Sequence, residues 1–393
     1  MKELQKLIAI KASLNMRFVE REKEIEGMLI SLLARQHMLL IGPAGTAKSA
    51  MIDELMKSIE GATLFQWQLT KFSTPEELFG PLSLKDLEIG LYKRNTSKKM
   101  PEANVAFLDE LFKANSAVLN SLLTLMNERL FYNGDQPMKV PLFSVIGASN
   151  EYPEEGEGLD ALFDRFLLRY EVDYIKEQTN FLAMMKQDEQ LKEVPTITLE
   201  ELHDYQELTE KVIIHNDIYE ALVKIRQELS DEGIRPSDRR FKKSLRILQA
   251  KALLEQRGVV HTDDLVILEN VLWKTHDQKE ATSLIVRRHA EDAVIRKLDS
   301  IQAEAVELFT IVLQQHCVDA GVEASQKLKA LLADLMKLKE THHTREEAIE
   351  QLLSKVQLMH EEVLTFLLEP LYFDASAKVR EFKQNMSSMN YKL

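Results

Sequence analysis

The chain contains little cysteine, glycine and proline. Of its 393 residues, one is cysteine, 13 are glycine and 10 are proline. The single thiol, Cys317, cannot form an internal disulfide, which favours a reducing compartment. So few glycines and prolines exclude collagen-like chains and Pro/Gly-rich disordered chains. The sequence therefore predicts globular domains that are stabilised by buried hydrophobic cores.

Long hydrophobic runs and an excess of positive charge are also missing. No stretch approaches the roughly 18 consecutive apolar residues of a membrane-spanning helix. The short apolar stretch at 7–10 is interrupted by Lys11, which excludes a signal peptide. The net charge is −13, whereas binding to a phosphate backbone depends on clustered Lys and Arg. These features predict a cytoplasmic protein without membrane insertion, for which nucleic acid is a disfavoured partner.

The residue pattern divides the chain into three regions. Helical segments alternate with short apolar runs between about residues 37 and 175, and strands that are buried on both faces of a parallel sheet have this composition. The expected strands lie at 37–42, 62–70, 103–110, 142–150 and 166–172. Amphipathic helices follow them. We expect a three-layer α/β domain at 1–190, an all-α domain at 191–297 and a further helical region at 298–393.

A strand, a glycine-containing loop and a helix follow one another near residue 45. The loop GPAGTAKS consists of Gly42, Pro43, Ala44, Gly45, Thr46, Ala47, Lys48 and Ser49. The glycines allow backbone N–H groups to point into one concavity, and the helix N-terminus adds partial positive charge. Lys48 can then reach the β- and γ-phosphates of a nucleotide, and Ser49 can bind Mg²⁺. Ala47 stands where such loops have glycine, and we expect the helix to begin there.

Two further strands end in polar side chains. The strand at 103–110 ends in Asp109 and Glu110, and the strand at 142–150 ends in Asn150. In open α/β sheets the ligand lies outside the carboxyl ends of the strands. We expect Asp109 to hold Mg²⁺ through water, Glu110 to polarise the attacking water, and Asn150 to hydrogen-bond the γ-phosphate or that water.

Four segments together resemble the MoxR family of AAA+ ATPases: GPAGTAKS, FLDELFKANSAVLNSLLTLMNER, GASNEYPEEGEGLDALFDRFLLR and PSDRRFKKSLRILQA. TKFSTPEELFGPLS, with GPAGTAKS and SDRRFKK, resembles the RavA subfamily most. The resemblance covers roughly residues 1–280. It implies an AAA+ P-loop NTPase core with a helical lid, which binds ATP and Mg²⁺ in a ring-shaped, hexameric homo-oligomer. Residues 298–393 depart from that subfamily, because they predict helices where it carries a small β-rich domain.

The resemblance also assigns roles to single residues. Residues 42–49 match the Walker A motif, Asp109 and Glu110 match Walker B, and Asn150 matches sensor 1. The further residues that it places around the nucleotide are Phe18 and Val19, which match the segment lining the adenine pocket, and Ala50, which follows the loop. The side chains of Phe18 and Val19 can equally serve ordinary helix packing.

Arginines are implied at two more positions. Arg165 matches the arginine finger that acts on the nucleotide of the neighbouring subunit, with Arg169 as the alternative. Arg239 matches sensor 2 in the lid, where it would contact the nucleotide, with Arg240 as the alternative. The pair Lys242-Lys243 follows on the same predicted helix, where it serves the electrostatic field of the nucleotide or has no role.

Two insertions distinguish the predicted α/β domain. Residues 71–102 exceed what a single helix needs and predict a helix interrupted by a β-hairpin, which resembles the helix-2 insert of the family. Asn133-Gly134 is a two-residue hairpin signal, and the segment 131–141 resembles the pre-sensor-1 hairpin. Both insertions are expected to face a pore or a client, the alternative being plain connections.

The sequence leaves three functions open. The resemblance implies a chaperone-like motor that remodels or matures a client, with a partner that carries a von Willebrand factor A domain. A nucleic-acid motor is the alternative, since helicase relatives share both hairpins, but the basic residues of the inserts are limited to Lys93-Arg94 and Lys98-Lys99. A nucleotide-gated scaffold is disfavoured by the presence of Lys48, Glu110 and Arg165.

Overall fold

The computed structural model of the protein describes residues 4–134, 136–152, 160–186, 195–290, 293–315, 317–341 and 346–368. The chain divides into two compact units, residues 1–290 and 291–393. The expected start of the C-terminal region at 298 lies inside α13 (Ala293–Gln315), and the expected boundary at 190 lies outside the described residues. None of the described helices combines the length and the apolar character needed to cross a membrane.

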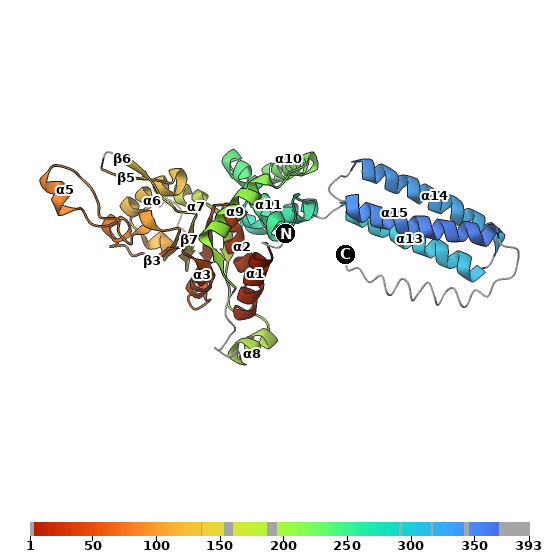
Figure 1. Ribbon diagram of the computed structural model, residues 1–393, viewed down its shortest axis with the longest axis horizontal. Helices are drawn as coiled ribbons and strands as arrows, with labels where there is room; N and C mark the ends of the chain where they lie inside the picture. Colours follow the sequence, from red (N-terminus) through yellow and green to blue (C-terminus); the bar gives the residue numbers. More distant parts are fainter. Residues whose placement is uncertain are drawn as a thin grey trace. The chain divides into compact units, whose positions relative to one another are not determined.

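A five-stranded parallel sheet lies at the centre of the first unit (Figure 1), and its strand order is β3-β4-β7-β1-β8. The strands are β1 (His37–Ile41), β3 (Leu64–Gln68), β4 (Val105–Asp109), β7 (Ser144–Ser149) and β8 (Phe166–Glu171). Each lies within one of the predicted apolar runs, and all their pairings are parallel. The sheet therefore has a carboxyl edge, where all five strands end, and an amino edge, where all five begin.

Helices cover both faces of this sheet. Alternate side chains of each strand enter different cores, as Leu40 and Phe107 do on one face and Leu39 and Leu108 on the other. The helices of the first face are α1 (Gln5–Arg17), α2 (Glu22–Leu33) and α3 (Lys48–Lys57), and those of the second are α4 (Pro75–Phe79), α6 (Ser116–Glu128) and α7 (Asp160–Arg165). This arrangement confirms the predicted three layers. The edge strand β3 differs from the prediction, because Gln66 and Gln68 are exposed.

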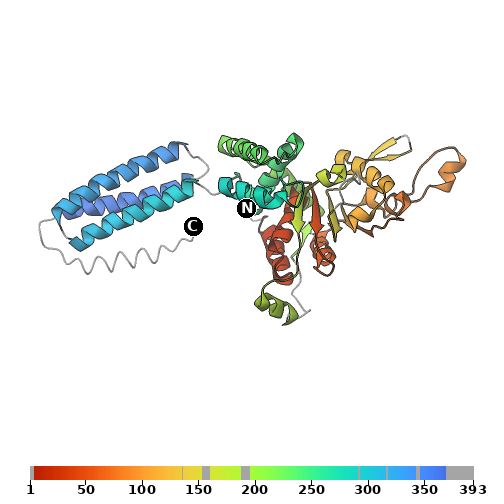
Figure 2. The same cartoon turned by 180° about the vertical axis from the view of Figure 1, so that it is seen from behind.

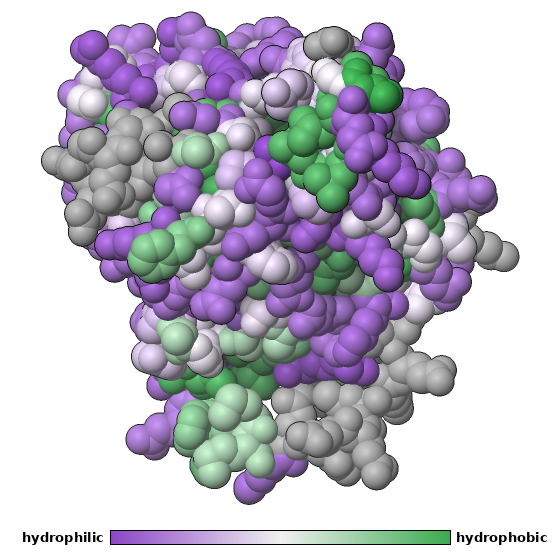
Figure 3. Space-filling model, turned by 90° about the vertical axis from the view of Figure 1, so that its left-hand side faces the viewer, coloured by the Kyte–Doolittle hydropathy of each residue, from purple (hydrophilic) through white to green (hydrophobic). Residues whose placement is uncertain are grey.

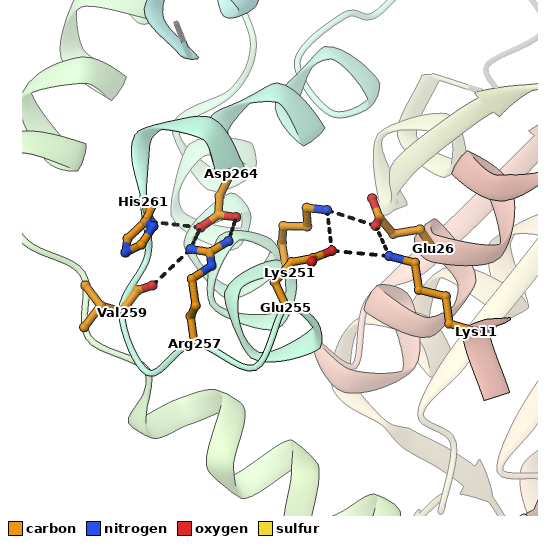
Figure 4. A network of polar contacts seen from close by, with 8 residues as sticks. All are labelled: Lys11, Glu26, Lys251, Glu255, Arg257, Val259, His261 and Asp264. Carbon is orange, nitrogen blue, oxygen red and sulfur yellow. Dashed lines mark hydrogen bonds and ion pairs between the residues drawn. The ribbon is translucent and has the colours of Figure 1, made fainter. Parts of the chain in front are cut away.

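The lid region is helical, as predicted, apart from one segment and one short strand pair. Its helices are α9 (Leu199–Lys211), α10 (Asn216–Asp231), α11 (Asp238–Leu254) and α12 (Gln278–Ala290), and β9 (Ile197–Thr198) precedes them and pairs with β2 (Ile59–Glu60). Residues 262–270, within the predicted all-α domain, form the 3-10 helix η3 (Thr262–Asn270). The buried carboxylate of Asp264 accepts hydrogen bonds from Arg257 and from the His261 backbone N–H, which fixes the start of η3 (Figure 4).

The lid and the α/β region share one hydrophobic core, to which α1, α2, α9, α10 and α11 all contribute. A group of alternating charges reinforces this contact (Figure 4). Lys251 on α11 lies 2.9 Å from Glu26 on α2 and 3.1 Å from Glu255. Lys11 on α1 lies 2.6 Å from the same Glu26 and 3.3 Å from Glu255. The two expected domains therefore form a single compact unit.

The buried side chain of Arg169 joins the sheet to the lid. It is 1% exposed and donates hydrogen bonds to the backbone oxygens of Phe163, Phe166 and Trp273. Its guanidinium also lies 3.9 Å from the centroid of the Phe163 ring. Since Trp273 belongs to the lid, this arginine connects the corner between α7 and β8 to it.

Arg240 makes a second connection at the same corner. Its side chain is 3% exposed and donates to the backbone oxygens of Asp164, Phe166, Leu167 and Val271. Its Nε lies 3.3 Å from the Asp164 carboxylate. Because Arg240 lies in the first turn of α11 and Val271 follows η3, two lid segments are joined to the residues that flank Arg165.

The two insertions differ partly from their prediction. The hairpin of β5 (Leu130–Asn133) and β6 (Gln136–Lys139) is present, but Asn133 pairs with Gln136 and so belongs to the strand instead of the turn. The insertion at 71–102 contains α4 and α5 (Leu84–Glu88), and its expected hairpin is reduced to a single antiparallel bridge between Leu82 and Arg94. The remaining short elements are η1 (Met100–Glu102), η2 (Leu111–Lys113) and α8 (Gln178–Lys186).

The two insertions are connected to each other. The Asn133 side chain accepts a hydrogen bond from the Arg94 backbone N–H at 2.6 Å and donates one to the Arg94 backbone oxygen at 3.1 Å. Large apolar side chains beside this contact are exposed, among them Leu84, Ile89 and Tyr92. Figure 3 faces the end of this unit that carries α5 and shows apolar side chains gathered at its surface.

The second unit consists of helices in its described residues, as predicted. α13, α14 (Val318–Thr341) and α15 (Glu346–Leu368) lie side by side (Figure 2). They enclose their own hydrophobic core, in which Leu328 and Val356 are fully buried. This unit therefore has a core that is separate from the two cores of the first unit.

We expect Arg169→Met to lower the free energy of unfolding by about 3 kcal/mol or more, because it removes several hydrogen bonds from a charged group and leaves buried carbonyls without donors. Arg165→Met, four residues away, should change it by less than about 0.5 kcal/mol. Urea denaturation followed by circular dichroism measures both values. Equal stability of the two variants would contradict a structural role for Arg169.

Candidate functional site

The glycine-containing loop connects β1 to α3 along a strained path. A side chain at Gly42 would place its Cβ 1.9 Å from the Val172 backbone oxygen, so only glycine fits there. Gly45 has φ +81°. Ala47 also lies in the left-handed region, at φ +65°, and α3 begins only at Lys48. The expectation that the helix starts at Ala47 is therefore wrong, since the tight turn needs a left-handed residue, which costs alanine about 1 kcal/mol.

Lys48 lies in the first turn of α3 and folds back over this loop. Its Nζ donates to the backbone oxygens of Gly42 at 2.6 Å and Pro43 at 2.8 Å. It also donates to Asn150 Oδ1 at 3.4 Å. Burial lowers the pKa of Lys48, although the carboxylates at the end of β4 act to raise it. The ammonium group is thus held by weak neutral acceptors that a phosphate can replace.

Glu110 follows β4 and meets the end of β7. Its backbone is left-handed, with φ 54° and ψ 42°, and its side chain is buried. Its Oε1 accepts a hydrogen bond from Asn150 Nδ2 at 2.6 Å. Its Oε2 lies 3.3 Å from Lys113 Nζ but makes no hydrogen bond with the described residues. The structure thus brings Lys48, Asn150 and Glu110 together at the carboxyl edge, where Lys113 is the charged neighbour of the buried Glu110 Oε2.

The two residues predicted to bind Mg²⁺ lie at the same edge. Ser49 is exposed in the first turn of α3, and Asp109 ends β4. Asp109 Oδ1 accepts a hydrogen bond from the Glu110 backbone N–H at 2.9 Å. Among the described residues no group of three or more His, Cys, Asp or Glu side chains converges on one point. The hydroxyl and the carboxylate suit Mg²⁺, which at phosphate sites takes few protein ligands and fills its shell with phosphate and water oxygens.

An apolar cavity of ≈ 390 Å³ adjoins the loop. Phe18 and Val19, predicted to line the adenine pocket, both line this cavity, and its assignment to adenine stays a prediction. Tyr174, Phe181 and Met184 also line it, although the sequence pattern did not predict them. The signal for Phe181 and Met184 was α8, a short helix after β8 that has apolar side chains but no buried residue. The remaining lining residues are Arg17, Arg21, Gly45, Thr46, Ala47 and Ile175.

Arg21 connects the loop to the neighbouring segments around this cavity. It is 6% exposed and donates to the backbone oxygens of Thr46 at 3.4 Å, Glu20 at 2.6 Å, and Asp173. The Glu20 carboxylate accepts hydrogen bonds from backbone and side-chain donors of the segment 176–180 that leads into α8. A hydrogen bond from the Lys176 backbone is the main reason that the pKa of Glu20 is lowered. These contacts position α8 beside the loop.

Arg165 lies at the opposite edge of the sheet from Lys48. It ends α7, and the next residue, Phe166, pairs with His37 at the start of β1. Since β1 rises about 3.3 Å per residue, its length of about 13 Å separates Arg165 from the loop. Arg165 Nε is buried and makes no hydrogen bond with the described residues. The guanidinium is therefore placed away from the nucleotide site of its own subunit.

Arg239 also lies at the amino edge. Its Nη2 donates to Asn127 Oδ1 at 2.5 Å, near the C-terminus of α6. Arg129 follows the last residue of α6, and its guanidinium contacts His37 at the start of β1. Burial and the charge of Arg239 lower the pKa of Arg165. The lid thus places Arg239 beside Arg165, and the expected contact of Arg239 with a nucleotide stays a prediction.

The alternatives to Arg165 and Arg239 are arginines that stabilise the fold. Arg169 and Arg240 are buried between the sheet and the lid, and they donate to backbone oxygens of both. Neither guanidinium faces a position that a nucleotide could occupy. Arg165 and Arg239 thus remain the candidates that the geometry favours.

Comparisons with known proteins identify the family of the chain. The family described as the MoxR domain in the MoxR-vWA-beta-propeller ternary systems matches residues 5–210. The AAA lid domain family matches residues 217–286. Both matches end before α13.

Similar proteins agree with these matches. Two uncharacterized proteins of Methanocaldococcus jannaschii are each 43% identical to the chain, one over 72% of this chain and 74% of its own length, the other over 68% and 72%. The chaperone MoxR1 of Mycobacterium tuberculosis is 26% identical over 53% of this chain and 55% of its own. A candidate ATPase of Cytophaga hutchinsonii with a solved structure shares the fold, with a TM-score of 0.60, 18% identity and coverage of 73% and 94%. The chain belongs to the MoxR family of AAA+ ATPases.

Proposed function

We propose that this protein hydrolyses ATP with Mg²⁺ in a ring-shaped, hexameric homo-oligomer in the cytoplasm, and uses the energy to remodel or mature a client protein. One observation carries the ATPase part. Lys48, Asn150 and Glu110 form a continuous set of contacts at the carboxyl edge, beside a loop whose glycines match a phosphate site.

The described residues suit the individual steps of hydrolysis. The adenine ring would enter the apolar cavity that Phe18 and Phe181 line, and the phosphates would bind the loop. Lys48 would exchange backbone oxygens for phosphate oxygens. Glu110 Oε2 would then hold the attacking water, and Asn150 would fix the orientation of that carboxylate. Mg²⁺, between Ser49 and Asp109, would neutralise charge on the phosphates.

The neighbouring subunit would complete the site. Arg165 lies at the edge opposite its own loop, so in a ring it would face the nucleotide of the next subunit. We assign Arg239 to the same task, because it lies beside Arg165 and not beside Lys48. Each site would thus need two subunits, which makes turnover dependent on assembly.

The partner and the client are inferred from the family. The matching family occurs in ternary systems with a von Willebrand factor A protein and a beta-propeller protein, which supports such a partner here. One relative is named as a chaperone, which supports remodelling of a client. The exposed apolar side chains around α5 offer a surface that such a client could contact. The assignment to a RavA-like subfamily stays a prediction, which rests on the segments TKFSTPEELFGPLS and SDRRFKK.

A nucleic-acid motor is the alternative function. Its support is the hairpin of β5 and β6, which helicase relatives share. The net charge of −13 disfavours it. DNA binding that weakens steeply with salt concentration would favour this alternative over the client-remodelling function.

Lys48→Ala should abolish measurable ATP binding, because the substitution removes the cation that compensates the β- and γ-phosphates. Glu110→Gln should bind ATP with nearly unchanged affinity but lose turnover by roughly a hundredfold or more, since an amide cannot accept the proton of the water. Fluorescent-nucleotide titration and phosphate release measure the two effects. Tight ATP binding by Lys48→Ala would overturn the assignment of the loop.

Arg165→Ala should lose turnover by on the order of 10³-fold while ATP binding is kept. Mixing it with Lys48→Ala subunits should restore part of the activity, because some interfaces then combine an intact loop with an intact arginine. The measurement is ATPase activity over a series of mixing ratios. If no mixing ratio restores activity, the result would contradict action of Arg165 on the neighbouring subunit.

A further inference from the structure

The amino edge holds more cations than the proposed function uses. Arg129, Arg165, Arg239 and Lys243 gather there, and we call them the amino-edge cations. Arg239 and Lys243 are four residues apart on α11 and so lie on the same face of that helix. Arg129 follows the end of α6, and Arg165 ends α7. Three separate elements thus direct positive charge toward one place.

These cations repel one another. Burial and the charges of Arg239, Arg129 and Arg165 lower the pKa of Lys243 to about 8. Asp164 is the acidic group that opposes this effect, and its carboxylate already lies 3.3 Å from Arg240 Nε. Two further titratable neighbours are Arg35, whose charge contributes to lowering the pKa of Arg129, and His37 on β1, whose pKa burial lowers well below 6.5, so that it stays neutral. The group therefore carries an excess of positive charge, which the single carboxylate of Asp164 offsets only in part.

The members of the group differ in what they bind within the subunit. Arg129 donates to the backbone oxygens of Arg35 and Phe143, and Arg239 donates to Asn127. Arg165 and Lys243 make no side-chain hydrogen bond or ion pair with the described residues, and Arg165 Nε is buried. Two cations of the group thus remain for an anion that comes from outside the subunit. An anion with several charges, such as a triphosphate, suits two cations at one point.

We propose that Lys243 is a further residue acting on the neighbouring subunit, where its ammonium group contacts the terminal phosphate of bound ATP beside Arg165 and Arg239. This inference rests on the proposed function, because it needs the neighbour's nucleotide at this edge. The inference applies to Lys243 and not to the adjacent Lys242, whose side chain is exposed. Lys243 would add a compact charge to the phosphate oxygens that the two arginines leave open.

The test uses the full chain with Lys243→Ala, Lys243→Met and the matched control Lys242→Ala. The two Lys243 variants should lower ATP turnover roughly ten- to a hundredfold, the effect of one lost contact to a charged group. The control should keep the turnover of the natural protein. ATP affinity of the separate subunits should be unchanged in all three, because Lys243 does not face its own loop. Removal of a repelled cation leaves the fold intact, which thermal unfolding checks.

Mixing and pH add two independent measurements. Lys243→Ala subunits mixed with Lys48→Ala subunits should regain activity, since a mixed interface joins an intact loop to an intact lysine. Only the protonated lysine contacts phosphate, so kcat/KM of the natural protein should fall as the pH rises through about 8, the pKa of Lys243 in the free subunit. Lys243→Arg should keep turnover and move this fall to higher pH.

The outcomes separate this inference from the proposed function. If Arg165→Ala is not rescued by mixing, the action across subunits fails as a whole. If Arg165→Ala is rescued while both Lys243 variants turn over ATP like Lys242→Ala, only the role of Lys243 is overturned. A loss of turnover at Lys243 that mixing never restores would place its effect within its own subunit and also overturn the inference.

Discussion

The parallel direction of all five strands is the constraint on which the site depends. It places the ends of β1, β4 and β7 at one edge, and so brings Lys48, Glu110 and Asn150 together although the sequence separates them widely. The same constraint places the start of β8, and with it Arg165, at the opposite edge. A single subunit therefore has the glycine-containing loop on one edge and a group of cations on the other, and under the proposed function a ring of identical subunits would bring these two edges together.

Two residues at the carboxyl edge have strained backbones. Ala47 and Glu110 are both in the left-handed region, which costs a residue with a side chain about 1–2 kcal/mol. Buried contacts maintain both conformations, because Arg21 holds the loop through the Thr46 backbone oxygen and Asn150 holds the Glu110 carboxylate.

The lid is joined to the corner that carries Arg165. Arg169 and Arg240 bind backbone oxygens on both sides of that residue and, in the lid, those of Trp273 and Val271. A displacement of the lid would therefore carry this corner with it. Since Arg239 and Lys243 lie on the same helix as Arg240, the lid also positions the other cations of the amino edge. Under the proposed function, lid movement and completion of the neighbouring site would thus be physically connected.

The sequence by itself determined the strands, the loop and the polar residues at the strand ends, because periodicity and spacing are local properties. The strands at 37–42 and 103–110 and the acids Asp109 and Glu110 lie where they were predicted. Only the tertiary structure decided which arginines are buried, on which edge Arg239 lies, and that α8 reaches the cavity. The physical reason is that a side chain's exposure and partners depend on segments far away in the sequence, such as Trp273 for Arg169.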